Sequence, residues 1–224
     1  MRTVILVLLI PALLFLGGCD SAREINDMAI VSGAAFDWDA EQETYRVTAE
    51  VVNREAEPGS QASPLVIDGE GKTPEEAMAN LDFKTSRKIL WSHARVLILS
   101  KETAKAGIAP FVEMVMADNS LRLSTELLIA DMDSAEKVWE ITTDATEMIG
   151  FDLDDMIHEA RESGGVPSLR AYHAKMLLET AGQPVIPMIG MDERENAVIT
   201  GAAILQGDKM VGSLSREEAE ALCR

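Results

Sequence analysis

One cysteine near the start of the chain stands where its thiol could be acylated. Arg2 precedes an almost wholly apolar run over residues 3–16, and the tetrapeptide LGGC then ends at Cys19. The run has about the length of a signal-peptide core and is shorter than the roughly 20 residues that cross a bilayer as a helix. Small residues before Cys19 let a peptidase approach the backbone, after which the thiol can accept a diacylglycerol.

This ending resembles the lipobox of bacterial lipoproteins, and it predicts a signal peptide over residues 1–18 and lipidation of Cys19. Two acyl chains hold a protein stably on a membrane, whereas one chain does not. Two alternatives are an uncleaved N-terminal anchor and ordinary secretion with Cys19 incidental. If Cys19 is lipidated, Cys223 has no disulfide partner, so the sequence indicates no disulfide framework.

The other residues capable of chemistry do not form a catalytic or metal-binding motif. No histidine is spaced with a second zinc ligand, and the chain has no nucleophile elbow, P-loop or dinucleotide-binding fingerprint. Paired carboxylates can do acid–base work, but these fall near helix starts, where acids also favour the helix dipole. We therefore expect no enzyme activity, no cofactor and no metal. The residues considered are His93, His158, His173, Asp131, Asp133, Asp152, Asp154, Asp155, Met114, Met116, Met188 and Met191.

The composition indicates a globular, acidic protein. The 224 residues are 47% hydrophobic and 26% charged, with only 4% aromatic, so the core must consist mainly of aliphatic side chains and methionine. The net charge of −18 excludes a nucleic-acid partner, because binding to phosphate backbones needs clustered Lys and Arg. An acidic surface is also repelled by anionic headgroups, so retention at a membrane would need an anchor.

The part of the mature chain over residues 19–145 shows alternating strand and helix patterns. The clearest strand covers residues 44–53, where Tyr45, Val47 and Ala49 share one face, and it forms a hairpin with the strand before it. Leu81 and Ile89 are taken as one stripe of a single helix that Thr73 caps. We expect strands at 25–35, 44–53, 64–69, 94–100 and 124–130, helices at 73–90, 101–106, 110–117 and from Ser134, a polar turn at 36–43 and a loop at 54–63.

The second part, residues 146–224, is predicted as a smaller α+β region. Its second helix is expected to turn Leu169, Tyr172, Met176 and Leu177 inward. A separate sheet built from the strands after Val185 would be marginal unless helices cover it. The fold class is α+β, a mixed or antiparallel sheet with flanking helices followed by this region. Its expected elements are helices at 147–163, 168–181 and 215–222, and strands at 185–189, 197–206 and 209–214.

Several segments, in order along nearly the whole mature chain, resemble the Ger(x)C family, the C-subunit lipoproteins of spore germinant receptors. No one motif is decisive, but their order is specific. The chain departs from the family at Asp20-Ser21, where the family has Trp, and around Arg122. The segments are EINDMAIVSG at 24–33, YRVT at 45–48, GKTPEEA at 71–77, SR at 86–87, SH at 92–93, AKAGI at 104–108, GAAI at 201–204, DKMVG at 208–212 and LS at 214–215.

The resemblance implies a non-enzymatic, lipid-anchored receptor subunit that acts in nutrient-triggered spore germination. Its partners would be the membrane-embedded A and B subunits, on the outer face of the cytoplasmic (spore inner) membrane. The family continues into a further domain, so the chain is expected to be an N-terminal portion that does not replace a full-length C subunit. The alternatives are a substrate-binding lipoprotein of a transporter and, disfavoured by the missing nucleophile motif, a lipid-anchored hydrolase.

Overall fold

A computed structural model describes residues 28–53, 63–143 and 148–223 of the chain. The predicted signal peptide, Cys19 and nearly all of the predicted loop at 54–63 lie outside the described residues. Among the described residues, no helix is both long enough and apolar enough to pass through a bilayer.

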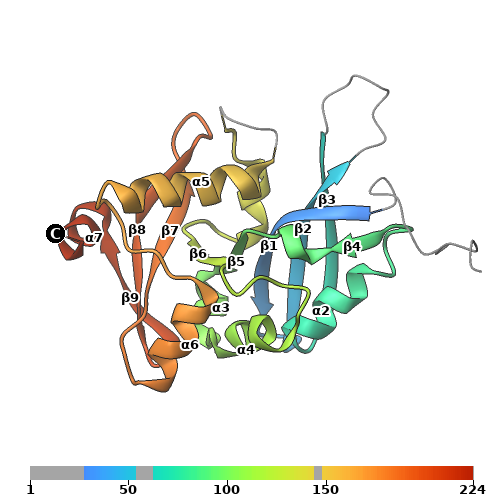
Figure 1. The fold of residues 1–224 in the computed structure, drawn as a ribbon, viewed down its shortest axis with the longest axis horizontal. Coiled ribbons are helices and arrows are strands. Elements are labelled where there is room, and N and C mark those ends of the chain that lie inside the picture. The colour runs from blue at the N-terminus through green and yellow to red at the C-terminus, as the bar shows by residue number, and fades with distance from the viewer. Residues whose placement is uncertain (1–27, 54–62, 144–147, 224) are drawn as a thin grey trace, which may run out of the picture.

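The described strands form one nine-stranded mixed sheet (Figure 1), which confirms the predicted α+β class. The central strands β1, β5, β6 and β7 run parallel, and antiparallel pairs flank them on both sides. The strand order is β3-β2-β1-β5-β6-β7-β8-β9, with β4 beside the start of β1. The strands are β1 (Met28–Asp39), β2 (Thr44–Asn53), β3 (Ser63–Gly71), β4 (Lys88–Leu90), β5 (Val96–Ser100), β6 (Glu126–Ala130), β7 (Val185–Met191), β8 (Ala197–Gln206) and β9 (Lys209–Ser215).

Alternating side chains of these strands supply two apolar cores, one on each face of the sheet. In β5, for example, Leu97 and Leu99 enter one core, whereas Val96 and Ile98 enter the other. Figure 1 shows α2, α4 and α6 in a row on one side of the sheet and α5 on the other. The helical elements are α2 (Pro74–Leu81), η2 (Trp91–His93), α3 (Lys101–Ala106), α4 (Ala109–Ala117), η3 (Ala135–Glu140), α5 (Ile149–Glu162), α6 (Ala171–Glu179) and α7 (Arg216–Leu222).

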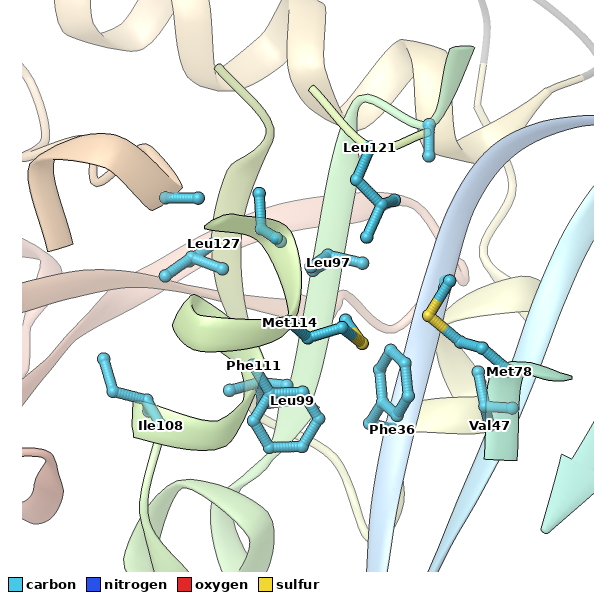
Figure 2. Close-up of a cluster of buried hydrophobic side chains, with 14 of the residues drawn as sticks. Phe36, Val47, Met78, Leu97, Leu99, Ile108, Phe111, Met114, Leu121 and Leu127 are labelled. Carbon is cyan, nitrogen blue, oxygen red and sulfur yellow. The ribbon is translucent and has the colours of Figure 1, made fainter. Parts of the chain in front are cut away.

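The larger core contains the aromatic cluster that corrects the predicted turn at 36–43. Phe36 is fully buried and meets the Phe111 ring edge-on at 5.0 Å between centroids (Figure 2). The Tyr45 ring also packs edge-on against Phe111, at 5.4 Å between centroids. Strand β1 therefore runs on to Asp39, and the turn is limited to residues 40–43. The polar residues that follow Phe36 are typical of a turn, so the sequence pattern did not predict that the strand continues through this buried side chain.

The predicted helix over 73–90 is also wrong in its second half. Thr73 caps α2 as expected, since its hydroxyl accepts the N–H of Glu76 at 3.2 Å, but the helix ends at Leu81. Ile89 lies instead in the short strand β4, which pairs with the start of β1 in parallel. Its spacing from Leu81 fits a helical stripe, and the strand pairing buries it just as well.

Two smaller predictions about helices are corrected by tertiary contacts. Ser134 makes no side-chain cap, and the carboxylate of Asp37 on β1 accepts the first N–H groups of η3 in its place. Helix α6 begins at Ala171, so Ala171 and Ala174 face the core, and Tyr172 is 41% exposed rather than buried. Met176, one turn further along, is exposed as well.

The strands of residues 146–224 extend the first sheet and do not form a second one. Strand β7 joins β6 through the pairs Ile129–Met188 and Ala130–Ile189. Helix α5 packs in the same core as β5 and β6, and α6 in the same core as α4. The division at residues 145/146 stays a prediction, because pairing in one sheet does not measure how the two parts unfold.

Hydrogen–deuterium exchange of the full chain tests this division. Only two residue pairs join β6 to β7, so we expect amides of β7–β9 to exchange about tenfold faster than those of β5 and β6. Within that group β9 should be fastest, because it is an edge strand with alternate residues exposed. Equal protection of β6 and β7 would contradict a division at this seam.

Candidate functional site

Helix α5 is held on the sheet by a buried carboxylate from strand β2. Glu50 is 1% exposed and accepts the N–H groups of Ile149 and Gly150, at 3.0 and 2.9 Å. The hydroxyl of Ser32 on β1 donates to the same carboxylate. Residue 150 must be glycine, since a Cβ there would lie 2.7 Å from the Ser32 hydroxyl oxygen. The carboxylate thus serves the orphan N–H groups at the start of α5, where negative charge is favoured.

The environment of Glu50 shifts its titration to higher pH than that of a free glutamate, because the pKa of its carboxyl is raised. Burial raises the pKa of the Glu50 carboxyl, and the hydrogen bonds from Gly150, Ser32 and Ile149 oppose that rise without cancelling it. The nearby carboxylate of Asp152 raises the pKa further. Glu50 is therefore a titratable group whose hydrogen bonds hold the start of α5 on β1 and β2.

A second buried carboxylate holds the segment that leads into α6. Glu126, the first residue of β6, accepts the Leu169 N–H at 2.6 Å and the Ser168 hydroxyl at 3.4 Å. The Nε atom of Arg170 lies 3.7 Å from the same carboxylate. Burial raises the pKa of Glu126, and the Leu169 N–H and the Arg170 charge oppose the rise. A strand carboxylate thus caps α5 directly, whereas Glu126 holds the two residues that lead into the N-cap of α6, and the first N–H groups of α6 bond the carbonyls of Thr125 and Leu123.

Three arginines converge near Glu126, in a cavity that we call the arginine pocket. Arg95 lies just before β5, and Arg170 just before α6. The Arg95 guanidinium lies 3.1 Å from Asp155 and 3.5 Å from Asp154, and stacks over the Phe151 ring at 4.9 Å. The cavity measures about 210 Å³. Its polar lining consists of Arg95, Arg122, Arg170, Asp154, Ser124 and Thr125.

Arg122 differs from the other two arginines of the pocket. It is exposed, and among the described residues it has no carboxylate within ion-pair distance. A guanidinium keeps its charge at every physiological pH and presents five N–H donors. The pocket therefore offers the unpaired guanidinium of Arg122 beside those of Arg95 and Arg170, which already bind carboxylates with some of their N–H donors. Together the three groups can hold an anion.

The opposite end of the sheet carries an acidic cavity of about 540 Å³. Asp37 is half-buried there and accepts the N–H groups of Ala135 and Glu136, at 2.7 and 3.1 Å. Burial raises the pKa of Asp37, and these two bonds oppose the rise. Arg46 lies 3.5 Å from Glu136 at the same end. The cavity's other acidic lining residues are Asp39, Glu70, Glu102 and Asp133.

The structure separates most of the residues that the sequence singled out for chemistry. The three histidines are all exposed and lie on different elements, η2, α5 and α6. Asp131 pairs with Lys101, and Asp152 bonds the Thr143 hydroxyl. Within the described ranges, no three His, Cys, Asp or Glu side chains are placed to hold a metal ion. Met114 and Met188 lie in the core, Met116 and Met191 are partly buried, and the Cys223 thiol is free and exposed.

Sequence reasoning missed the two carboxylates that organise this end of the molecule. Glu50 and Glu126 each occupy a strand of otherwise apolar or alternating residues. An acid inside such a strand is the only signal available, and it does not name the partner about 100 residues away in the first case.

A profile of the family described as "Spore germination protein N-terminal domain" matches residues 21–191. Spore germination protein KC of Bacillus subtilis (strain 168) is 25% identical over 230 residues, which cover 92% of this chain and 55% of that protein. The putative spore germination protein YfkR of the same organism is 25% identical over 239 residues, covering 99% and 61%. GerQC of Bacillus cereus is 22% identical over 209 residues, covering 91% and 56%.

The chain thus spans little more than half the length of the curated relatives it matches. Among solved structures, the crystal structure of the GerBC protein is similar, with a TM-score of 0.42 and 20% sequence identity. The match covers 85% of this chain and 54% of that one.

Replacing Glu50 by glutamine tests the buried carboxylate through pH. The unfolded chain releases the Glu50 proton near the ordinary pKa of 4.5, whereas the folded chain releases it at higher pH. The folded state therefore binds more protons in this window, and its stability falls as the pH rises through it. Chemical unfolding at several pH values should show a shallower fall for Glu50→Gln than for wild type. The matched change Glu113→Gln, on the exposed side of α4, should leave the slope unchanged. Parallel curves for Glu50→Gln and wild type would contradict this account.

Proposed function

The chain belongs to the Ger(x)C family of spore germination proteins, and we propose that it acts as the lipid-anchored C-type subunit of a spore germinant receptor. In this role it would be a non-enzymatic assembly component on the outer face of the cytoplasmic (spore inner) membrane. Its partners would be the membrane-embedded A and B subunits, during nutrient-triggered germination.

One observation carries this proposal: the family domain begins at residue 21, two residues after the predicted lipidation site. The LGGC tetrapeptide therefore stands at the boundary between an apolar leader and the matched domain. A lipid at Cys19 would tether the domain by its N-terminus, through the few residues that lead into β1. The names of the relatives, which are spore germination proteins, support the receptor role.

The use of the buried carboxylates supports a role without catalysis. Glu50 and Asp37 each accept two hydrogen bonds from backbone N–H groups. Glu126 accepts one from the Leu169 N–H and one from the Ser168 hydroxyl. A general acid or base needs free access to a substrate proton, within about 3 Å. Glu50 and Asp37 have their oxygens committed to helix starts, and Glu126 has its oxygens committed to the segment before α6. The comparisons give no support to the transporter alternative, and the described strands form one sheet rather than two lobes.

Changing Cys19 to alanine tests the anchor. We expect Cys19→Ala to lose acyl labelling and to leave the membrane pellet, because a net charge of −18 provides no general electrostatic retention. Acyl mass and sedimentation after a salt wash measure both effects. Cys223→Ala is the matched control and should keep label and membrane, since it removes the other cysteine, which is exposed and free. A Cys19→Ala chain that stays in the washed pellet would favour the uncleaved anchor instead.

Affinity capture of the full chain from detergent-solubilised spore membranes tests the receptor role. We expect the A and B subunits to be recovered with it in comparable amounts, and to be lost in a strain that lacks them. A transporter permease recovered in their place would overturn the proposal and restore the substrate-binding alternative.

A further inference from the structure

The arginine pocket lies at the end of the sheet from which the predicted anchor extends. Strands β1, β5 and β6 are parallel, so their first residues lie toward one edge. The Arg95 N–H bonds the Ser32 carbonyl of β1 at 2.8 Å, which places Arg95 beside the early part of that strand. β1 begins at Met28, nine residues after Cys19. Nine extended residues reach about 30 Å at most, so a lipid on Cys19 holds this end near the bilayer.

The pocket has the donors that recognise a phosphate group. Three guanidiniums and the Ser124 hydroxyl line it, against the single carboxylate of Asp154. Planar guanidinium groups match the oxygens of a phosphate in pairs. The other nearby acids are already engaged, because Asp155 pairs with Arg95 and the Glu126 carboxylate accepts the Leu169 N–H. Arg122 is the cation left to meet an incoming anion.

Exposed apolar side chains border the pocket on the side of Arg122 and Arg170. Leu123 is 50% exposed and Tyr172 is 41% exposed, and the Tyr172 N–H bonds the Leu123 carbonyl at 3.1 Å. Tyrosine is enriched where one end of a side chain is apolar and the other is wet, as at the boundary between headgroups and acyl chains. A cation beside such a rim fits a lipid headgroup better than a freely dissolved ion.

The overall negative charge does not prevent local attraction. The Debye length at physiological ionic strength is about 8 Å, so charges further away are largely screened. The acidic cavity at Asp37 and Asp39 is separated from Ser32 by up to seven residues of β1, roughly 20 Å. The end of the sheet at Asp37 is lined mainly by acids, so it is the less suitable of the two ends to face an anionic surface.

We propose that the arginine pocket binds the phosphate of an anionic phospholipid while Cys19 anchors the chain, and so fixes how the domain stands on the membrane. The proposal rests on the lipid anchor of the proposed function. The anchor supplies retention, and the pocket supplies orientation.

The test uses the full lipidated chain in two kinds of vesicle, one of phosphatidylcholine alone and one that also contains about 30% phosphatidylglycerol. Hydrogen exchange of peptides that contain Arg95, Arg122 and Arg170 reports occupancy of the pocket. We expect roughly fivefold slower exchange with phosphatidylglycerol, in line with the attraction of one arginine to an anionic leaflet. Arg122→Gln should abolish the difference without disturbing an ion pair. Added salt should weaken it.

Arg46→Gln is the matched control, since it removes the same charge at the opposite end of the sheet and should keep the effect. Equal exchange in the two kinds of vesicle, or an effect that persists in Arg122→Gln, would overturn the proposal. A further outcome is that dissolved inorganic phosphate slows the exchange on phosphatidylcholine vesicles while phosphatidylglycerol has no effect. That result would assign the pocket to a soluble ligand and overturn the proposal of a phospholipid. Slowing that appears only with receptor subunits present would assign it to a protein carboxylate, with the same consequence. A chain without acyl mass would show instead that the anchor itself had failed.

Discussion

The first N–H groups of α5 find their acceptor on a strand about 100 residues earlier in the chain. Because Glu50 is buried and accepts the N–H groups of both Ile149 and Gly150, the start of the helix is fixed against the paired strands β1 and β2. A helix start buried without such an acceptor would leave several donors unsatisfied, each at a cost of about 1–3 kcal/mol. The β6–β7 crossover therefore depends on the N-terminal hairpin at α5, and Glu126 holds the segment just before α6 through the Leu169 N–H.

The same arrangement determines where polar chemistry can lie. Strand side chains alternate between two apolar cores, so helices cover the broad faces of the central sheet. Polar groups gather at the strand ends, where the chain enters and leaves the sheet. Because the central strands are parallel, the two ends of the sheet differ in charged residues. The arginines lie where these strands begin, and the carboxylates around Asp37 lie where they end.

Local sequence patterns were sufficient to predict a helix or strand where its structure depends on its own residues. The alternation over 44–53 and the Thr73 cap of α2 are both found as predicted. Prediction failed where a distant segment decides. Phe36 is in a strand because Phe111 packs on it, and Ile89 is in β4 because β1 pairs with it. The carboxylates of Glu50 and Glu126 could not be assigned, since their partners are set by strand order, which the sequence does not display locally.

The geometry of the arginine pocket follows from these buried carboxylates rather than from the arginines themselves. The two acids that orient Arg95 are on α5, whose start Glu50 holds, and Arg170 follows directly on the segment held by Glu126. Two of the three arginines are thus positioned by elements that pack in the core, although their side chains are partly exposed. Rigid placement matters for a tethered domain, because a lipid on a short leader restrains distance from the membrane but leaves rotation free. Contacts at a second point remove that rotation, and a pocket in which Arg95 and Arg170 are positioned by ion pairs can serve as such a point.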